Sequence, residues 1–495
     1  MEAPLIEVPD GTVTTPQGFR AGATDARVRD DYAQGRLDLA LLYSERPSAA
    51  AAVYTQNSFL GPPLRVTRGH LADGRAQAVI ANSGIANCLT GEPGVGDAKE
   101  MARLAAEKLG VAEAGIRKLN RRDLTLIELA PGSRAAGVFT LNRFCAAPVQ
   151  LCKQHLPGGG IRALVINTGV ANAGTGEQGL ANAHATCVAV ARLLDLAPEQ
   201  VLPFSTGVIL EPLPVDRLVA GLPAAHADLR GDGWFDAAHA IMTTDTVAKQ
   251  TAVQFQHDGV TYSVGGCAKG SGMIHPNMAT MLSFLTTDAA VEQRYLQSVL
   301  GDVVEVSYNM MTIDGDTSPE DLVLLLANGA AANGGGSIDA DHPAAPVFRA
   351  AVEHVAITLA RKLARDGEGA SKLIEVRVDG AASNEDARLV AKEVAGSSLV
   401  KTAVFGNDPN WGRILVAAGN SGARIVEERV SLAVQGVDLY RDGEPLPFDK
   451  ASVSDALRQS EVRFRIDLGL GDATATAWGC DLTPEYVRIN SEYTT

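Results

Sequence analysis

The chain has 495 residues, of which 46% are hydrophobic, and its formal net charge is −15. A chain of this length and apolar fraction can bury a large core in two or three domains. The acidic balance disfavours nucleic acid and anionic membrane surfaces as partners, so composition alone favours an acidic soluble enzyme.

Six cysteines are scattered along the sequence and form no Cys-x-x-Cys pair. This distribution is typical of reduced core thiols in a cytosolic protein rather than of disulfides or a metal site. A basic-then-apolar leader and an apolar run of about 18 or more residues are also missing, so we expect neither export nor a membrane-spanning helix. The sequence therefore predicts a cytoplasmic protein.

The N-terminal part of the chain contains an internal duplication. Residues 53–92 align with residues 138–177 without a gap at a constant offset of 85, and sixteen of the forty aligned residues are identical. Chance would give about two or three identities, so the segments are copies of one unit. Each copy is predicted to contain an alternating strand (37–42 or 124–129), a strand that ends in Asn-Ser/Thr-Gly-x-Ala-Asn, and a helix rich in Ala and Leu.

Only the second copy, which begins near Val111, continues into the rest of the chain. Residues 1–110 therefore form a partial duplicate of the same N-terminal region. A natural duplication, a recombinant chimera and an incorrect gene join all fit this arrangement. The extra copy has strand and helix faces that need burial, so it must displace the second copy, add to a sheet edge or dimer, or stay poorly packed.

Beyond the repeat the pattern is mixed α and β. The predicted helices are 215–224, 234–242, 291–306, 347–363 and 384–394, and the predicted strands or hairpins are 251–264, 280–287, 322–326, 373–378 and 430–446. The two hairpins are expected to turn at Asp-Gly pairs, in 257–259 and 441–443. The helix at 347–363 places five apolar residues on one face: Phe348, Val352, Val355, Leu359 and Leu363.

Residues 269–282 combine loop and strand signals around Thr280. They read KGSGMIHPNMATML, in which two glycines and a proline make a loop that leads into an apolar, β-branched strand. Cleavage of the Ala279–Thr280 bond would make Thr280 a new N-terminus. Its α-amine, with an unperturbed pKa of roughly 7.7–8.0, could then take the proton of its own hydroxyl. An Ala-Thr pair before a core strand is also common without such chemistry.

Two motifs supply groups that such a nucleophile would need. Ser205-Thr206-Gly207 follows a predicted strand and offers a hydroxyl and a backbone N–H, a suitable pair of oxyanion donors. As an isolated tripeptide it fits a turn equally well. Lys269 is a cation eleven residues before Thr280 and can bind a carboxylate, although a solvated loop lysine looks the same in sequence.

Three other motifs have ordinary structural explanations too. The polar residues 243–246 follow a predicted helix and can cap a helix end. The glycines of Arg365-Asp-Gly-Glu-Gly can terminate the helix 347–363 and leave Glu368 exposed. The last ten residues, 486–495, read as a fraying tail.

Together these motifs resemble those of the ornithine acetyltransferase family, the glutamate N-acetyltransferases of arginine biosynthesis. The whole string at 269–282 resembles the family's processing site, and residues 405–413, FGNDPNWGR, are also family-like. The resemblance implies a mixed α/β fold with sheets layered against helices. It also implies an α chain of 111–279, preceded by the extra 1–110, and a β chain of 280–495, assembled as a cytoplasmic α2β2 heterotetramer.

The resemblance assigns roles to individual residues. Thr280 is the implied nucleophile after cleavage from Ala279, with Thr206 and Gly207 as the oxyanion hole. Glu368 is the implied partner of a substrate ammonium, and Lys269 is an implied substrate ligand. The complete implied substrate-binding set is Thr243, Lys269, Thr280, Glu368, Asn490 and Thr495.

The implied reaction is ping-pong. The acetyl group of N2-acetylornithine passes to Thr280, ornithine leaves, and glutamate takes the acetyl group. No metal or bound organic cofactor is implied, and acetyl-CoA stays open as a further donor. Two rival interpretations are an N-terminal-nucleophile amidohydrolase or aminopeptidase, which would resolve the ester with water, and a non-catalytic chimeric protein.

The sequence departs from the family pattern in two places. Both repeats have an apolar residue, Ile85 or Val170, where family members commonly have the second residue of Gly-Asn-Ala-Asn, and this change could perturb hydrogen bonding on the oxyanion side. Pro319 and Glu320 replace the usual residues after Asp-Gly-Asp-Thr-Ser, which puts a polar contact there in doubt.

Overall fold

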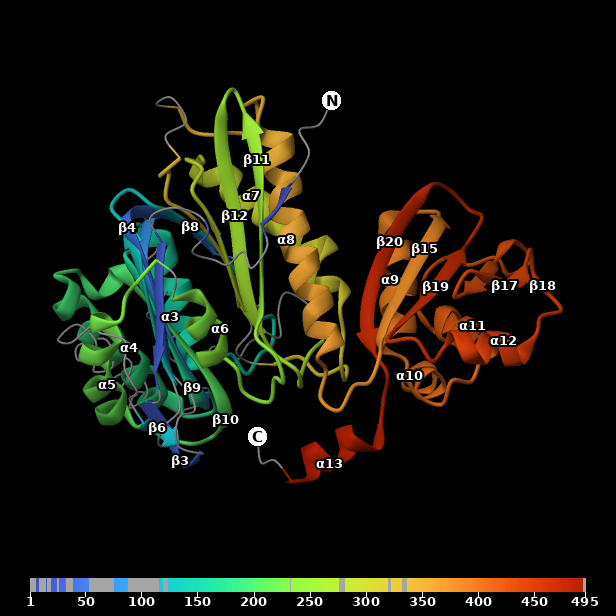
Figure 1. Cartoon of the computed structure of the whole chain (residues 1–495), viewed down its shortest axis with the longest axis horizontal. Coiled ribbons are helices and arrows are strands. Elements are labelled where there is room, and N and C mark those ends of the chain that lie inside the picture. The colour runs from blue at the N-terminus through green and yellow to red at the C-terminus, as the bar shows by residue number, and fades with distance from the viewer. Residues whose placement is uncertain are drawn as a thin grey trace.

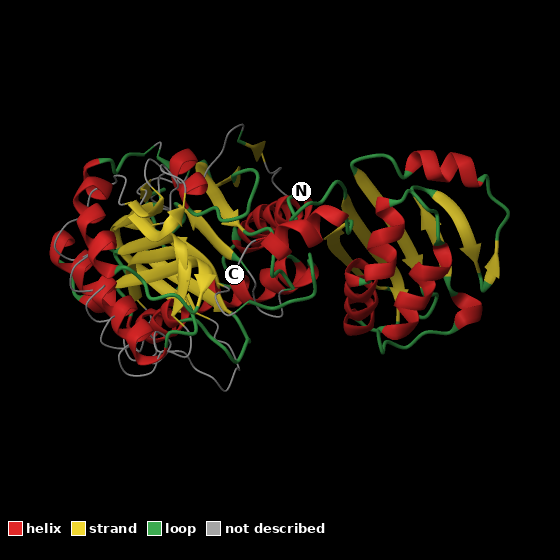
Figure 2. Ribbon diagram, turned by 90° about the horizontal axis from the view of Figure 1, so that it is seen from below, coloured by secondary structure: helices red, strands yellow, loops and turns green. Residues whose placement is uncertain are grey.

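The computed structural model describes residues 6–8, 15, 19–24, 26–32, 39–52, 75–87, 115–118, 123–231, 233–275, 281–318, 322–331 and 336–492. Figure 1 shows these residues as a large lobe that includes the N-terminal strands, and a smaller lobe built from the C-terminal quarter of the chain. Figure 2, turned by 90°, shows the two lobes side by side with helices covering the sheets. The mixed α/β class with sheets layered against helices is confirmed.

The larger sheet has twelve strands within the described ranges, in the order β1-β11-β12-β13-β14-β4-β2-β7-β9-β10-β5, with β8 paired to β4. Additional pairings join β4 to β7, β9 and β5, and β9 to β5, so the strands of the two copies do not form a single linear order. Its strands up to residue 209 are β1 (Ile6–Glu7), β2 (Phe19–Thr24), β4 (Leu39–Ala52), β5 (Arg75–Asn87), β7 (Leu124–Ala130), β8 (Arg134–Phe139), β9 (Ala163–Asn172) and β10 (Val201–Ile209). Separately, β3 (Ala26–Tyr32) pairs with β6 (Gly115–Lys118). The strand predicted at 124–129 is confirmed, and the one predicted at 37–42 overlaps β4.

Four helices belong to the same part of the large lobe. They are α3 (Ala147–His155), α4 (Gly176–Leu194), α5 (Val215–Ala227) and α6 (Trp234–Ala240). The small and apolar residues of α4 pack against the strands, as the Ala- and Leu-rich pattern of the second copy predicted. The corresponding helix of the first copy falls outside the described residues.

A central layer follows, made of β11 (Lys249–His257), β12 (Val260–Lys269), β13 (Leu282–Thr287), β14 (Leu322–Ala327), α7 (Gln293–Val306) and α8 (Ala345–Arg365). The predicted hairpin is confirmed, because Asp258 and Gly259 both have positive φ, 48° and 77°, as a two-residue type I′ turn requires. All five apolar residues predicted on one face of α8 are fully buried. Each contributes about 1.5–3 kcal/mol by leaving water.

The smaller lobe has a six-stranded sheet, within the described ranges, in the order β18-β17-β16-β19-β15-β20. Its strands are β15 (Leu373–Ala381), β16 (Ser431–Val434), β17 (Val437–Arg441), β18 (Glu444–Pro445), β19 (Glu461–Asp467) and β20 (Ala473–Cys480). Its helices are α9 (Asn384–Gly396), α10 (Ser398–Phe405), α11 (Trp411–Asn420), α12 (Lys450–Ala456) and α13 (Pro484–Glu492).

One prediction for this lobe is wrong in detail, and the alternative interpretation of the C-terminal segment is excluded. The single hairpin predicted at 430–446 is a three-stranded meander, since Gln435 and Gly436 form an additional turn with positive φ of 50° and 80°. The C-terminal segment is the helix α13 rather than a fraying tail, up to Glu492. The Thr483 hydroxyl fixes the approach to this helix by donating to the Gly369 carbonyl at 2.8 Å.

Two further observations concern the chemical environment of the fold. The five described cysteines, Cys145, Cys152, Cys187, Cys267 and Cys480, are buried free thiols, and burial raises the pKa of each of the last four. Of the helices that the structure describes, none is long and apolar enough to cross a bilayer.

Candidate active site

The proposed oxyanion pair lies inside β10 and not after a strand as predicted. Thr206 is 5% exposed and stands opposite Thr168 of β9, while Gly207 stands opposite Gly169. Gly207 has a φ of 136°, a conformation that residues with a Cβ rarely adopt. The strand therefore continues through the motif, and glycine permits the unusual φ within it.

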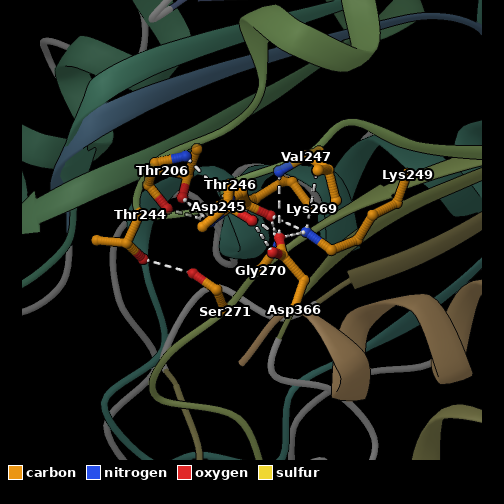
Figure 3. A network of polar contacts seen from close by, with 11 residues as sticks. Thr206, Thr244, Asp245, Thr246, Val247, Lys249, Lys269, Gly270, Ser271 and Asp366 are labelled. Atoms are coloured by element: carbon orange, nitrogen blue, oxygen red, sulfur yellow. Dashed lines mark hydrogen bonds and ion pairs between the residues drawn. The ribbon is translucent and has the colours of Figure 1, made fainter. Parts of the chain in front are cut away.

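Lys269 connects three residues of the predicted site. It is the last residue of β12 and only 8% exposed. Its ammonium donates to the Thr206 hydroxyl at 2.9 Å and to the Thr243 hydroxyl at 2.8 Å. Tertiary folding thus brings together the strand β10, the loop after α6 and the end of β12, which are far apart in the sequence (Figure 3). The interpretation of Lys269 as a solvated loop lysine is wrong.

Glu368 and Asn490 form a second group. Glu368 is 7% exposed, in the turn after α8, and Asn490 lies on α13. The Asn490 amide donates to a Glu368 carboxylate oxygen at 2.7 Å. In Figure 1, α13 extends from the smaller lobe back beneath the central layer, so the C-terminal helix brings Asn490 to a turn that is 122 residues earlier.

The electrostatics of Glu368 reflect its burial. Removal from water raises the pKa of this carboxyl, and the nearby carboxylates Asp314 and Asp245 act in the same direction. Hydrogen bonds from Thr244 and Asn490 oppose the increase without cancelling it. The net direction is upward, so this carboxyl gives up its proton less readily than a solvated glutamate.

Ser271 links the two groups, and the sequence interpretation assigned it no role. Its hydroxyl lies 2.7 Å from the Thr244 hydroxyl (Figure 3). Its carbonyl accepts the Glu368 backbone N–H at 2.7 Å. It is 1% exposed. The sequence feature that could have identified Ser271 is its position between two glycines, because polar residues in glycine-rich loops often hydrogen-bond to the backbone.

The segment that precedes the proposed cleavage point is anchored up to His275. The carboxylate of Asp314 accepts the backbone N–H groups of Met273, at 2.6 Å, and Ile274, at 2.8 Å. The His275 ring lies 2.9 Å from the Thr312 hydroxyl. Burial lowers the pKa of His275 to about 4, and the charge of Lys392 adds to this, so the ring is neutral at pH 7.

Three predicted site residues, Ala279, Thr280 and Thr495, lie outside the described residues, as do Pro319 and Glu320. The description resumes at Met281, and Leu282, two positions after Thr280 in the sequence, is paired with Lys269 in the β12–β13 ladder. The other departure from the family pattern, Val170, is buried in β9 opposite Val208, and its carbonyl accepts the Asn167 amide at 2.9 Å.

The described residues offer donors for an oxyanion, an ammonium that suits a carboxylate, and a carboxylate that suits an ammonium. Such a set fits a small amino-acid substrate and acyl transfer. Groups of three or more His, Cys, Asp and Glu side chains that could hold a metal ion are absent from the described part of the chain.

Comparisons with known proteins agree with this chemistry. A sequence model of the ArgJ family matches residues 20–116 and, separately, residues 108–495. The two matches confirm the predicted duplication. The arginine biosynthesis bifunctional protein ArgJ of Symbiobacterium thermophilum is 44% identical over 485 residues, which cover 98% of this chain and 99% of that protein.

Two solved structures are also similar. The crystal structure of the arginine biosynthesis bifunctional protein ArgJ from Bacillus halodurans is 41% identical, and the match covers all of that chain and 43% of this one with a TM-score of 0.42. The ornithine acetyltransferase of Mycobacterium tuberculosis, solved with ornithine, is 29% identical, and the match covers all of that chain and 56% of this one with a TM-score of 0.34.

The close packing of Gly272 against Glu368 gives a test of the site. A Cβ at residue 272 would overlap the Glu368 carboxyl group, so Gly272→Ala should displace Glu368 and weaken its bond to Asn490. We expect a loss of acetyltransferase activity of about tenfold or more, measured as kcat/KM.

Gly301→Ala in α7 is the matched control. No atom lies within 4 Å of the Cβ it would add, and alanine favours a helix interior by roughly 0.5–1 kcal/mol. This control should keep full activity and gain stability. Equal activity of the two variants would show that Glu368 has no part in the site.

Proposed function

This chain belongs to the ArgJ family, and we propose on that basis that it is a self-processing acetyltransferase of arginine biosynthesis, which transfers the acetyl group of N2-acetylornithine to glutamate. The observation that carries the proposal is the position of Lys269, whose ammonium contacts both Thr206 and Thr243. These contacts bring together four residues of the predicted site, because Gly207 follows Thr206 in β10: Lys269, Thr206, Thr243 and Gly207.

The charges of the site match those of the donor substrate. N2-acetylornithine has one carboxylate, one ammonium and an acetylated amine. In the proposed complex Lys269 binds the carboxylate and Glu368 binds the ammonium, with Asn490 orienting Glu368. Both charged side chains are more than 90% buried, which strengthens their interactions with a bound substrate.

The proposed reaction has two half-reactions around Thr280. The Thr280 α-amine takes the hydroxyl proton, the oxygen attacks the acetyl carbon, and the carbon–nitrogen bond of the amide breaks as the proton passes to the leaving amine. The Thr206 hydroxyl and the Gly207 N–H stabilise the oxyanion. Ornithine leaves, and the amine of glutamate attacks the acetyl-Thr280 ester in the same way.

The same proposal covers the organisation of the chain. Cleavage between Ala279 and Thr280 would leave an α chain that ends at residue 279 and a β chain of 280–495, which we propose to assemble as a cytoplasmic α2β2 unit. Thr495 would complete the substrate-binding set. Acetyl-CoA is a candidate second donor, and the proposed chemistry uses no bound cofactor.

Acetyl transfer and chain cleavage can be tested together. The purified protein should run as two fragments on a denaturing gel and should transfer labelled acetyl from N2-acetylornithine to glutamate. Thr280→Ala should stay an intact chain of 51.7 kDa and lose transfer, because it has neither the hydroxyl nor a new N-terminus. Thr280→Ser, which keeps a hydroxyl, is the control and should retain both activities in part.

Release of free acetate without acetylglutamate would instead identify an amidohydrolase. An uncleaved, inactive wild-type chain would support the non-catalytic alternative. Transfer that persists in Thr280→Ala would remove Thr280 from the mechanism.

The raised pKa of Glu368 predicts a pH dependence. Only the carboxylate form binds an ammonium, so the KM for N2-acetylornithine should rise as the pH falls through the raised pKa of this group. Glu368→Gln should raise KM about tenfold or more near pH 8. It should also abolish the rise of KM at low pH, called the acid limb below. The measurement is KM between pH 5 and pH 9.

Glu461→Gln is the control for this measurement, since Glu461 is a partly exposed carboxylate paired with Arg361. It should keep the wild-type KM and the acid limb. An acid limb that survives in Glu368→Gln would assign the titration to another group.

A further inference from the structure

A buried ionic cluster stands directly behind the candidate site. We propose that Asp245, held in place by Lys249, is a positioning residue that fixes the backbone on both sides of the Lys269 ammonium. This inference rests on the proposed role of Lys269 in binding the substrate carboxylate. It concerns residues to which neither the motifs nor the family resemblance gave a function.

The two oxygens of the Asp245 carboxylate hold two different segments. One oxygen accepts the Gly270 backbone N–H at 2.6 Å, and the other accepts the Thr243 backbone N–H at 3.0 Å (Figure 3). Gly270 directly follows Lys269, and Thr243 is one of the two hydroxyl partners of Lys269. A single carboxylate therefore sets the distance between the lysine and one of its partners.

Lys249 fixes the position of Asp245 in turn. Its ammonium contacts Asp245 and Asp366 at 2.6 Å each, and its side chain is 1% exposed. Asp366 accepts the Thr246 backbone N–H at 3.1 Å and lies two residues before Glu368. Groups buried this deeply hold one geometry, because any rearrangement would leave a charge unpaired in the interior.

The charges of the cluster balance only when Lys269 is included. Asp245 and Asp366 contribute two negative charges, and Lys249 and Lys269 contribute two positive ones. Burial alone would raise the pKa of Asp245, but Lys249, Lys269 and the hydrogen bonds from Lys249 and Gly270 outweigh it and lower the pKa. Asp245 is therefore ionised at neutral pH.

The test is the effect of Asp245→Asn on KM and kcat. Asparagine has one carbonyl oxygen to accept an N–H group, so it cannot hold both Gly270 and Thr243 and has no charge for Lys249. Misplacement of Lys269 weakens carboxylate binding in the ground state and the transition state alike, so KM should rise about tenfold or more while kcat falls less than about threefold. Loss of folded protein would do the opposite, since it lowers apparent kcat and leaves KM unchanged.

Asp288→Asn is the matched control. Asp288, which directly follows β13, is also a buried carboxylate, 2% exposed, and accepts the backbone N–H of Ser263 at 2.8 Å. Ser263 lies on β12, six residues before Lys269. The Asp288→Asn change should leave KM unchanged. If Asp245→Asn does not fold, Asp245→Glu carries the same test, because it keeps a negative charge for Lys249 but moves the carboxylate away from the Gly270 and Thr243 N–H groups.

An unchanged KM in the folded Asp245 variant would overturn this inference. The proposed function would survive that result, since it is judged on acetyl transfer by the wild-type protein. A wild-type protein that transfers no acetyl would instead remove the proposed function itself.

An independent observation concerns the duplicated strands. The two copies pair with the same neighbouring strands. A given residue of such a neighbour faces two residues, one in each copy, whose numbers differ by the repeat offset of 85. Strand β10 runs parallel to β9 and to β5, and six of its residues face equivalent positions in both. Strands β5 and β9 also pair with each other, with Asn82 opposite Asn167, so they do not simply occupy the two opposite edges of β10. The pairs are Ser205 with Asn167 and Asn82, Thr206 with Thr168 and Ser83, and Val208 with Val170 and Ile85.

The same relation holds for the strands β4 and β7. Arg20 of β2 is paired antiparallel with Tyr43 of β4 and with Glu128 of β7. Similarly, β9 pairs antiparallel with both strands, and its Ile166 faces residue 40 in one and residue 125 in the other. Strands β4 and β7 also pair with each other, with Tyr43 opposite Glu128. Adjacent strands stand about 4.8 Å apart in one linear order, so three strands cannot all be neighbours of one another, and β4 and β7 share one position beside β2.

We infer that the two copies are alternative occupants of one position in the larger sheet. In a given molecule one copy fills the place beside β2 and β10, and the other is excluded from it. Of the three fates open to the extra copy, this register selects competition between the copies over addition to a separate sheet edge.

Hydrogen exchange on the intact chain tests the competition. In each molecule the amides of only one of the segments 75–87 and 163–172 should be protected from exchange. Across the sample, either one segment is protected in all molecules, or the protected fractions of the two segments add up to one. Full protection of both segments in every molecule would show two separate places and overturn the inference.

Two shortened chains give a second test. Residues 111–495 keep only the second copy, and residues 1–87 joined to 173–495 keep only the first, with Asn87 in the place of Asn172. Both should fold and be cleaved before Thr280. If only 111–495 is cleaved and the exchange experiment shows both segments protected, the copies are not interchangeable.

Discussion

The buried ammonium of Lys269 is the interaction on which the described site depends. A cation that is 8% exposed needs partners, because its desolvation is costly without them. Two hydroxyls and the carboxylate of Asp245 provide them, from a strand, a loop and the cluster behind it. The positions of Thr206, Thr243 and Gly270 therefore follow from one requirement, which is that this charge be satisfied in the interior.

Glycine makes this arrangement sterically possible. Gly207 adopts a positive φ within β10, and Gly270 does so directly after Lys269, with φ of 143°. Gly272 leaves room for the Glu368 carboxyl group, which a side chain would fill. The glycines of the motifs are thus places where backbone approaches a charged side chain, in addition to being loop formers. Ser271, between Gly270 and Gly272, contacts the Thr244 hydroxyl and accepts the Glu368 backbone N–H.

The duplication adds a constraint of a different kind. A position in a sheet is defined by the residues of the neighbouring strands that face it. Here β5 and β9 face the same residues of β10. Only the copy that occupies this position can bury its apolar faces in the sheet. The apolar faces of the other copy then have no burial in the sheet. The charged network involves only residues from Thr206 onward, so neither copy contributes a residue to it.

The sequence by itself determined the mixed α/β class, the buried face of α8 and the hairpin at Asp258–Gly259, because these follow from local periodicity and turn chemistry. It also determined the duplication, because a repeat is visible when the chain is aligned with itself. It also identified Thr206, Thr243, Lys269, Glu368 and Asn490, although their roles came from motif resemblance. Only the tertiary structure decided that Lys269 is buried, that α13 carries Asn490 to Glu368, and that Asp245, Lys249 and Ser271 support the site. Partners such as Lys249 and Asp366 are 117 residues apart, and no local pattern encodes a contact over that separation. Burial turns such ordinary polar residues into a fixed network, because a charge removed from water must find its partner within the fold.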